Sequence, residues 1–191
     1  CQQAVLRANR ETGRNTLYAP SMVGNPASLY AQARLLREEG VGAALVAPAL
    51  IGMPVFEELV AAHLQVPVIA HPAYAGAARV APAFLLGRLF RLFGADAVIY
   101  PNYGGRFAYS EAECRAIADN ARAPWTGVRS ALPVPAGGMT VARVPELVGC
   151  YGNEVMLLIG GSLLQAGDAL EVRTREFVER VAVCAQQETA P

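Results

Sequence analysis

The feature that most constrains the fold is a regular alternation of short apolar runs with amphipathic stretches of helical length. Apolar runs such as GAALVAPAL (42–50) and VPVIAHP (66–72) are typical of strands buried on both faces of a sheet. Stretches such as NPASLYAQARLLREEG (25–40) and SEAECRAIADNAR (110–122) have the composition and end signals of helices. Six strand-helix units follow an initial helical stretch, AVLRANRETG (4–13). Such alternation with short links predicts an α/β fold with a parallel sheet.

Local signals mark the ends and faces of these elements. Asn25 can cap the helix expected at 25–40, and Ser110 and Glu113 form a capping box at the start of the helix at 110–122. The expected apolar stripe of the first of these helices is Leu29, Ala33 and Leu36. The other strands are expected at 15–21, 96–101, 130–138 and 154–161, and the other helices at 54–64, 83–94, 142–152 and 169–183. Arg88 and Arg91 are expected on the solvent side of their helix.

A parallel α/β sheet is either open or closed into a barrel. The chain lacks the GxGxxG fingerprint that an open dinucleotide-binding sheet carries after its first strand. A complete (β/α)8 barrel needs about 250 residues, so six units fit strands three to eight of a partial TIM barrel. We expect residues 1–14 to be an orphan helix from the second unit, 15–186 the six units and 187–191 a tail. Because the chain begins at Cys1 within a helical stretch, we expect it to be part of a longer protein.

Composition excludes several classes of function. The 16 basic residues are all arginine, so lysine Schiff bases and P-loop lysines are excluded within the chain. A net charge of zero without a basic block argues against a nucleic-acid partner. No apolar run reaches the roughly 18 residues of a membrane span. The widely spaced cysteines suit reduced thiols in a cytoplasmic protein.

The active site of a barrel lies at the carboxyl ends of its strands, where this chain offers few titratable groups. His71 is either a functional residue or a histidine hydrogen-bonded to nearby backbone. The pairs Gly137–Gly138 and Gly160–Gly161 end the last two strands, either as plain turns or as a backbone anion site. In IYPNYGGRF (99–107), Arg106 lies either on a solvated loop or on a mobile lid. No Asp or Glu stands at a strand end, so this segment alone cannot assemble a magnesium or zinc site.

Longer stretches resemble a known family. LPVPAGGMTVARVPELVGCYG (132–152) and VMLLIGGSLL (155–164) resemble the strand-seven and strand-eight phosphate-binding segments of the RuBisCO large-subunit superfamily. IAHPAYAGA (69–77) and GADAVIYPNYGGRF (94–107) extend the resemblance to nearly the whole chain. The resemblance implies the C-terminal portion of a RuBisCO-type barrel domain.

The resemblance also implies roles for individual residues. Gly137–Gly138 and Gly160–Gly161 match the backbone phosphate binders, and His71 matches the histidine at the end of strand five. YPNYGGRF matches the mobile loop 6, with Asn102 as a substrate-binding residue and Arg106 where the carboxylases carry a catalytic lysine.

Three departures separate the chain from true carboxylases: Pro72, Ile99 and Ala136 replace residues that grip the bisphosphate. The resemblance therefore implies a RuBisCO-like protein that acts on a phosphorylated keto sugar acid through a magnesium-stabilised enediolate. Decarboxylation of the 3-oxo-isoapionate 4-phosphate type is the preferred interpretation. The alternatives are an enolase or isomerase of methionine salvage, an inert or phosphate-binding fragment, and an open α/β domain unrelated to RuBisCO.

The family's magnesium ligands lie on the first two barrel strands, so we expect them upstream of this chain. The N-terminal domain is expected there too, in a full-length protein that forms a homodimer. Prepared alone, the 191-residue chain is expected to be inactive, to bind no magnesium and to self-associate through an unpaired strand edge.

Overall fold

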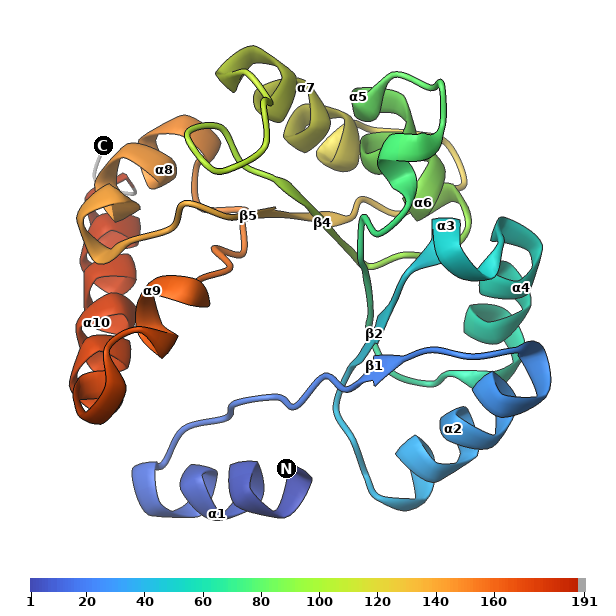
Figure 1. The fold of residues 1–191 in the computed structure, drawn as a ribbon, viewed down its shortest axis with the longest axis horizontal. Helices are drawn as coiled ribbons and strands as arrows, with labels where there is room; N and C mark the ends of the chain where they lie inside the picture. Colours follow the sequence, from blue (N-terminus) through green and yellow to red (C-terminus); the bar gives the residue numbers. More distant parts are fainter. Residues whose placement is uncertain (189–191) are drawn as a thin grey trace.

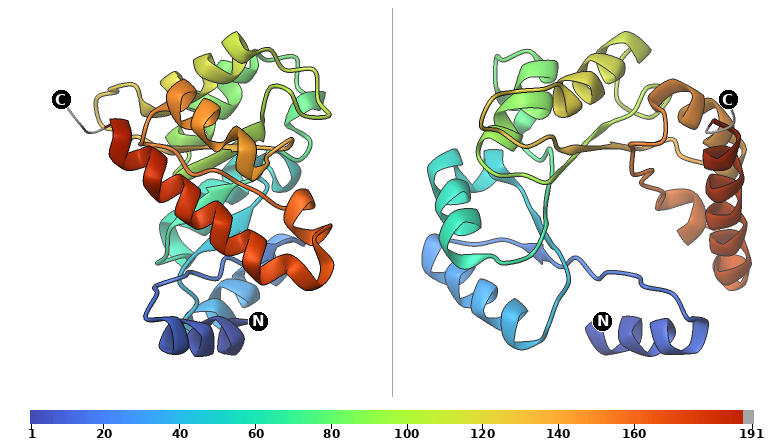
Figure 2. Two further views of the ribbon diagram at one scale, coloured as in Figure 1. Left: turned by 90° about the vertical axis from the view of Figure 1, so that its left-hand side faces the viewer. Right: turned by 180° about the vertical axis from the view of Figure 1, so that it is seen from behind.

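The structure, a computed structural model, describes residues 1–188 of the chain. Five parallel strands pair in the order of the sequence. They are β1 (Ser21–Met22), β2 (Ala44–Val46), β3 (Val68–Ala70), β4 (Ala97–Pro101) and β5 (Leu132–Ala136). Figure 1 shows the helices around the outside of this curved sheet, with a gap between α1 and the segment of α9 and α10. The view from behind in Figure 2 shows the same open side, so the ring of strands and helices is incomplete. The parallel pairing of all five strands confirms the predicted α/β arrangement.

Most helices lie where the sequence predicts them. The longer ones are α1 (Gln2–Thr12), α2 (Pro26–Glu38), α7 (Glu111–Arg122), α8 (Val144–Tyr151) and α10 (Leu170–Glu188). Two others run on as π-helices: α4 (Met53–Glu58) into Leu59–His63, and α5 (Pro82–Phe84) through Leu85–Leu89 into α6 (Phe90–Leu92). Short helical turns are α3 (Pro48–Ile51), Ala75–Ala77, Val141–Arg143, α9 (Gly161–Leu164) and Gly167–Ala169. None of the described helices has the length and apolar character needed to cross a membrane.

The predicted helix caps are confirmed. Asn25 Oδ1 accepts a hydrogen bond from the Ser28 amide at 2.9 Å, and the apolar stripe of α2 is buried. Ser110 Oγ accepts from the Glu113 amide at 3.2 Å, while Glu113 Oε2 accepts from the Ser110 amide at 2.9 Å. Each bond satisfies a backbone donor that the first helical turn leaves without a partner.

Several predicted boundaries were wrong. The strand expected at 15–21 overlaps the observed β1, Ser21–Met22, at one residue only. The end of the run at 42–50 turns into α3 because Pro48 favours the first turn of a helix. The tail expected from 187 is partly helix, since α10 reaches Glu188; residues 189–191 lie outside the described part of the chain. Arg91 is not on the solvent side: it is buried, and its guanidinium donates to the carbonyls of Ala121 (2.6 Å) and Ala123 (2.7 Å).

The sixth predicted strand lies beside β5 but makes few ladder bonds with it. The amides of Met156 and Leu158 donate to the carbonyls of Pro133 (3.0 Å) and Pro135 (3.2 Å). In a parallel ladder these two β5 residues would also donate towards the segment, but proline has no N–H. An isolated bridge between Ala136 and Leu158 therefore marks the place of the strand.

The two faces of β4 show how the strands divide the core. Val98 and Tyr100 are buried in the large cluster between the sheet and the helices. Ala97 and Ile99 face the other way and pack with Val134 in a small cluster on the inner face. β4 ends at Pro101, and the loop that contains Arg106 begins there.

Candidate functional site

The loop after β4 folds directly onto the glycine pair after β5. A Cβ atom built on Gly138 would lie 3.0 Å from both the Gly104 carbonyl oxygen and the Gly105 Cα. Gly104 and Gly138 also have φ angles of 70° and 67°, which L residues with side chains rarely adopt. The glycines of this loop therefore allow two backbones to meet with no side chain between them.

The second glycine pair lies at the same edge of the sheet. Ser162, which follows Gly160–Gly161, donates from Oγ to the carbonyl of Met139 at 2.8 Å, and Met139 follows Gly138. A Cβ on Gly161 would have no neighbour within 4 Å, so protein packing does not require glycine there. The open space beside Gly161 would let an anionic ligand come close to the backbone N–H groups there.

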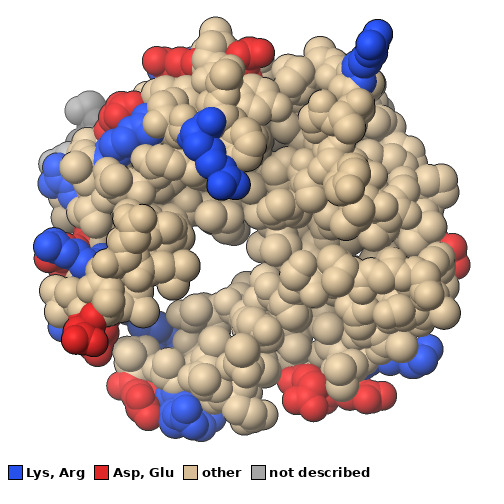
Figure 3. All heavy atoms as spheres, viewed as in Figure 1, with Lys and Arg blue, Asp and Glu red and all other residues tan. Residues whose placement is uncertain are grey.

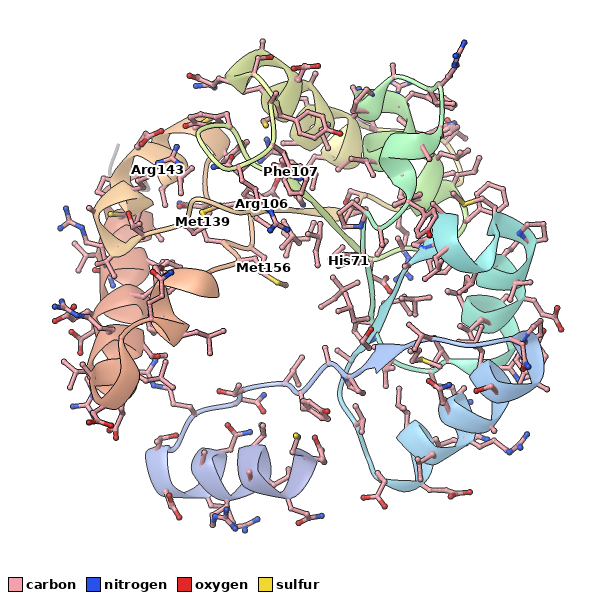
Figure 4. The ribbon with its side chains drawn as sticks, in the orientation of Figure 1. His71, Arg106, Phe107, Met139, Arg143 and Met156 are labelled. Carbon is pink, nitrogen blue, oxygen red and sulfur yellow. The ribbon has the colours of Figure 1, made fainter. Side chains whose placement is uncertain are left out.

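Arg106 is exposed at the outer end of this loop. Its guanidinium carbon lies 4.9 Å from the centroid of the Phe107 ring, a cation–π contact. Within the described residues it has no hydrogen-bond or ion-pair partner. Figure 4 shows Arg106 reaching towards the central opening, where Met156 and His71 also lie. In Figure 3 the walls of this opening carry few charged side chains compared with the outer helices.

His71 follows β3 and is held in one tautomer. Its amide donates to the carbonyl of Val46 at 2.7 Å, and its Nδ1 accepts from the amide of Ala73 at 3.1 Å. Partial desolvation lowers the pKa of the imidazole, which favours the neutral ring. With Nδ1 acting as acceptor, the proton of the neutral ring is on Nε2, so His71 can donate a hydrogen bond from its free side. His63 is elsewhere, stacked on Tyr30 in the helical layer.

Asn102, the expected substrate contact, is buried at the base of the loop after β4. Its side chain is fully buried, and Oδ1 accepts a hydrogen bond of 2.6 Å from the hydroxyl of Tyr151 on α8. Its amide donates to the carbonyl of Ala136 at 2.8 Å, which extends the pairing of β4 with β5. Asn102 thus anchors the base of the loop.

The sequence interpretation missed Arg143, which contacts both loops. Its Nη1 lies 3.3 Å from the carbonyl oxygens of Tyr103 and Gly138, one in each loop. Its Nε and Nη2 donate to the two carboxylate oxygens of Glu146 at 3.1 and 2.8 Å. Arginine and glutamate three residues apart also occur at Arg173 and Glu176, so spacing alone carries no signal for this role.

The described residues do not fit a magnesium ion. No three of their His, Cys, Asp or Glu side chains lie close enough to hold a metal together. Magnesium prefers carboxylate oxygens, and no Asp or Glu stands at the loop ends that form this site.

No protein-family model matches the chain. The chain is 47% identical over 184 residues to a 5-methylthioribulose-1-phosphate isomerase from Rhodospirillum rubrum, a match that covers 96% of the chain and 49% of the relative. It is 33% identical over 189 residues to a 2,3-diketo-5-methylthiopentyl-1-phosphate enolase from Microcystis aeruginosa, covering 95% of the chain and 48% of the relative. The chain thus spans about half the length of the curated relatives it matches. The crystal structure of a Rubisco-like protein from Rhodopseudomonas palustris superposes with a TM-score of 0.88 at 47% identity, over 95% of this chain and 49% of that one.

Proposed function

Because the chain belongs to the RuBisCO-like proteins of the RuBisCO large-subunit superfamily, with the fold of their C-terminal barrel portion, we propose that the complete protein isomerises a phosphorylated ketose. The observation that carries this proposal is the 47% identity to the 5-methylthioribulose-1-phosphate isomerase along 96% of the chain. The decarboxylase interpretation preferred from the sequence gives way to its alternative, since the named relatives are an isomerase and an enolase. Enolisation of a diketo phosphate is the second candidate, supported by the 33% identity to the enolase.

The proposed substrate has a phosphate at one end and a methylthio group at the other. We assign the phosphate to the backbone N–H groups of Gly137–Gly138 and Gly160–Gly161, which lie at one edge of the sheet. Phe107 and Met156 are exposed apolar side chains near the same opening. Both suit an apolar sulfur-containing end, because thioether sulfur contacts aromatic rings favourably and methionine is a flexible apolar side chain.

Isomerisation of a ketose begins when a base takes a proton from the carbon next to the carbonyl, which leaves negative charge on the carbonyl oxygen. Arg106 and His71 are donors in this proposal, so we assign the base to another part of the complete protein. The unpaired guanidinium of Arg106 would stabilise this charge, and the Nε2–H of His71 would donate to a substrate oxygen. Asn102 is reassigned from substrate contact to the anchor of the loop. For the complete protein we also propose that it binds magnesium through residues outside this chain and forms a homodimer.

A substrate panel tests this function. The complete protein is incubated with 5-methylthioribulose 1-phosphate, the diketo phosphate, 3-oxo-isoapionate 4-phosphate, or ribulose bisphosphate with CO2. Phosphorus NMR follows each reaction. We expect a new sugar-phosphate signal from the methylthio ketose and no carboxylated product. Release of CO2 from the keto acid, with the ketose unchanged, would instead restore the decarboxylase interpretation.

A further inference from the structure

We propose that Arg143 is a positioning residue that fixes the base of the loop at 103–109 and so sets where Arg106 lies. The effect of Arg143 on kcat rests on the proposed function, but the fixing of the loop by Arg143 does not. The loop follows β4, whereas Arg143 lies at the start of α8, after β5.

The first observation is that one guanidinium nitrogen bridges two loops. Arg143 Nη1 lies 3.3 Å from the carbonyl oxygen of Tyr103 and 3.3 Å from that of Gly138. A Cβ on Gly104 would lie 3.2 Å from the same nitrogen, so the guanidinium rests against the loop backbone. Movement of the loop away from Gly138 would break this bridge.

The second observation is that the guanidinium is held in place from its other side. Glu146 accepts from both Nε and Nη2, a two-point contact that fixes the plane of the fork. The Tyr103 ring lies 5.1 Å below the guanidinium carbon, and the Arg143 side chain is only 21% exposed. By contrast, Arg175 on α10 pairs with Glu171 while 65% exposed, and its recorded bond stays within its own helix.

Together these contacts hold one part of the loop and leave another part unheld. Asn102 is anchored to Tyr151, and Tyr103 to Arg143, whereas residues 106–108 are exposed. Arg106 is three residues beyond Tyr103, so the backbone from which its side chain extends over the opening is held close to a fixed residue. A shift of about 1 Å in such a group can cost roughly 100-fold in rate.

Hydrogen exchange on the complete protein tests the fixing of the loop without any substrate. Arg143→Met removes the donors and keeps an unbranched apolar stem in place of that of arginine, and Arg175→Met is the matched control in an ion pair away from the loop. We expect amides at 103–109 to exchange about 10-fold faster in Arg143→Met, with α7 unchanged, and no change in the control. Unchanged exchange at 103–109 would overturn the proposal, whatever the substrate of the enzyme proves to be.

A double-mutant cycle tests whether Arg143 acts through Arg106. We expect Arg143→Met to lower kcat by about 10-fold when Arg106 is present, and by less than about 2-fold in the Arg106→Met background. Arg143→Lys should restore part of the rate, because it keeps a donor but not the fork. An equal loss in both backgrounds would show general destabilisation and overturn the positioning role. If only the isomerase assay fails, the proposed function is wrong, and the hydrogen-exchange result still tests whether Arg143 fixes the loop.

Discussion

At the scale of single residues, Arg106 carries the most specific chemical expectation. Its exposed guanidinium lies against the ring of Phe107 and has no hydrogen-bond or ion-pair partner among residues 1–188, so it is available to a substrate anion. We expect Arg106→Met in the complete protein to lower kcat by about 100-fold, the typical effect of losing one donor to a developing oxyanion. Arg106→Lys should recover only part of this loss. Arg10→Met, on the outer helix α1, is the control, and an unchanged kcat in Arg106→Met would return the residue to a solvated loop.

Glu146 makes the loop contact sensitive to acid. Hydrogen bonding to Arg143, and to a lesser extent to Tyr103, lowers the pKa of its carboxyl group from 4.5 to about 2. A carboxyl whose pKa is lower in the folded state stabilises the fold above its unfolded pKa, and this stabilisation is lost as the pH falls through the folded value. Because the side chain is 49% exposed, we expect it to contribute no more than about 1 kcal/mol.

Urea unfolding of the wild type and Glu146→Gln at several pH values measures this effect. The difference between their midpoints should be largest above about pH 4.5 and should vanish towards pH 2. Glu176→Gln, in an ion pair of the same spacing on α10, is the control. A difference that does not depend on pH would show that the charge of Glu146 is not what stabilises the loop.

How far single residues could be predicted depended on whether their partners were local. The caps at Asn25 and Ser110 were predictable because donor and acceptor lie three residues apart. The burial of Arg91 and Asn102 was not, because their partners lie 30 to 49 residues away on α7, its end and α8. Arg143 was missed for the same reason: its contact with Tyr103 spans 40 residues.

At the scale of elements, strand order was more predictable than strand length. Apolar runs identified the positions of β2, β3, β4 and β5, since a parallel strand covered on both faces needs no polar residue. The strand expected at 15–21 overlaps β1 at Ser21 alone. The apolar runs gave no signal for where pairing stops. On the side of β5 that faces residues 154–161, regular pairing is limited because Pro133 and Pro135 offer carbonyls but no N–H to that segment.

The start of α9 offers a direct test of the phosphate assignment. Gly161 and Gly149 both lie in helices, and a Cβ on either would meet no atom within 4 Å. Gly161→Leu in the complete protein should raise KM for the phosphorylated substrate by at least about 10-fold, because the side chain enters the space assigned to the phosphate. Gly149→Leu, in α8, should leave KM unchanged. Equal KM values for the wild type and Gly161→Leu would place the phosphate elsewhere.

At the scale of the whole molecule, the sheet has two edges. Within the part of the chain that the structure describes, β1 pairs with β2 alone, and the segment after β5 is bridged to β5 alone. Unpaired edges invite association with other chains. We expect the 191-residue chain, prepared alone, to self-associate in light scattering and to bind no magnesium in calorimetric titration. Stoichiometric magnesium binding by this chain would mean that a metal site has been overlooked.

The central claim is that two glycine pairs hold a phosphate at one edge of the sheet while the loop after β4 places Arg106 over the reacting atoms. The most direct measurement is a crystal structure of the complete protein with 5-methylthioribulose 1-phosphate or its product bound. We expect phosphate oxygens within hydrogen-bond distance of backbone N–H groups in Gly137–Gly138 and Gly160–Gly161. We also expect the Arg106 guanidinium to bind a substrate oxygen, with Arg143 still bridging Tyr103 and Gly138. A phosphate bound away from both glycine pairs, with Arg106 turned to solvent, would contradict this claim.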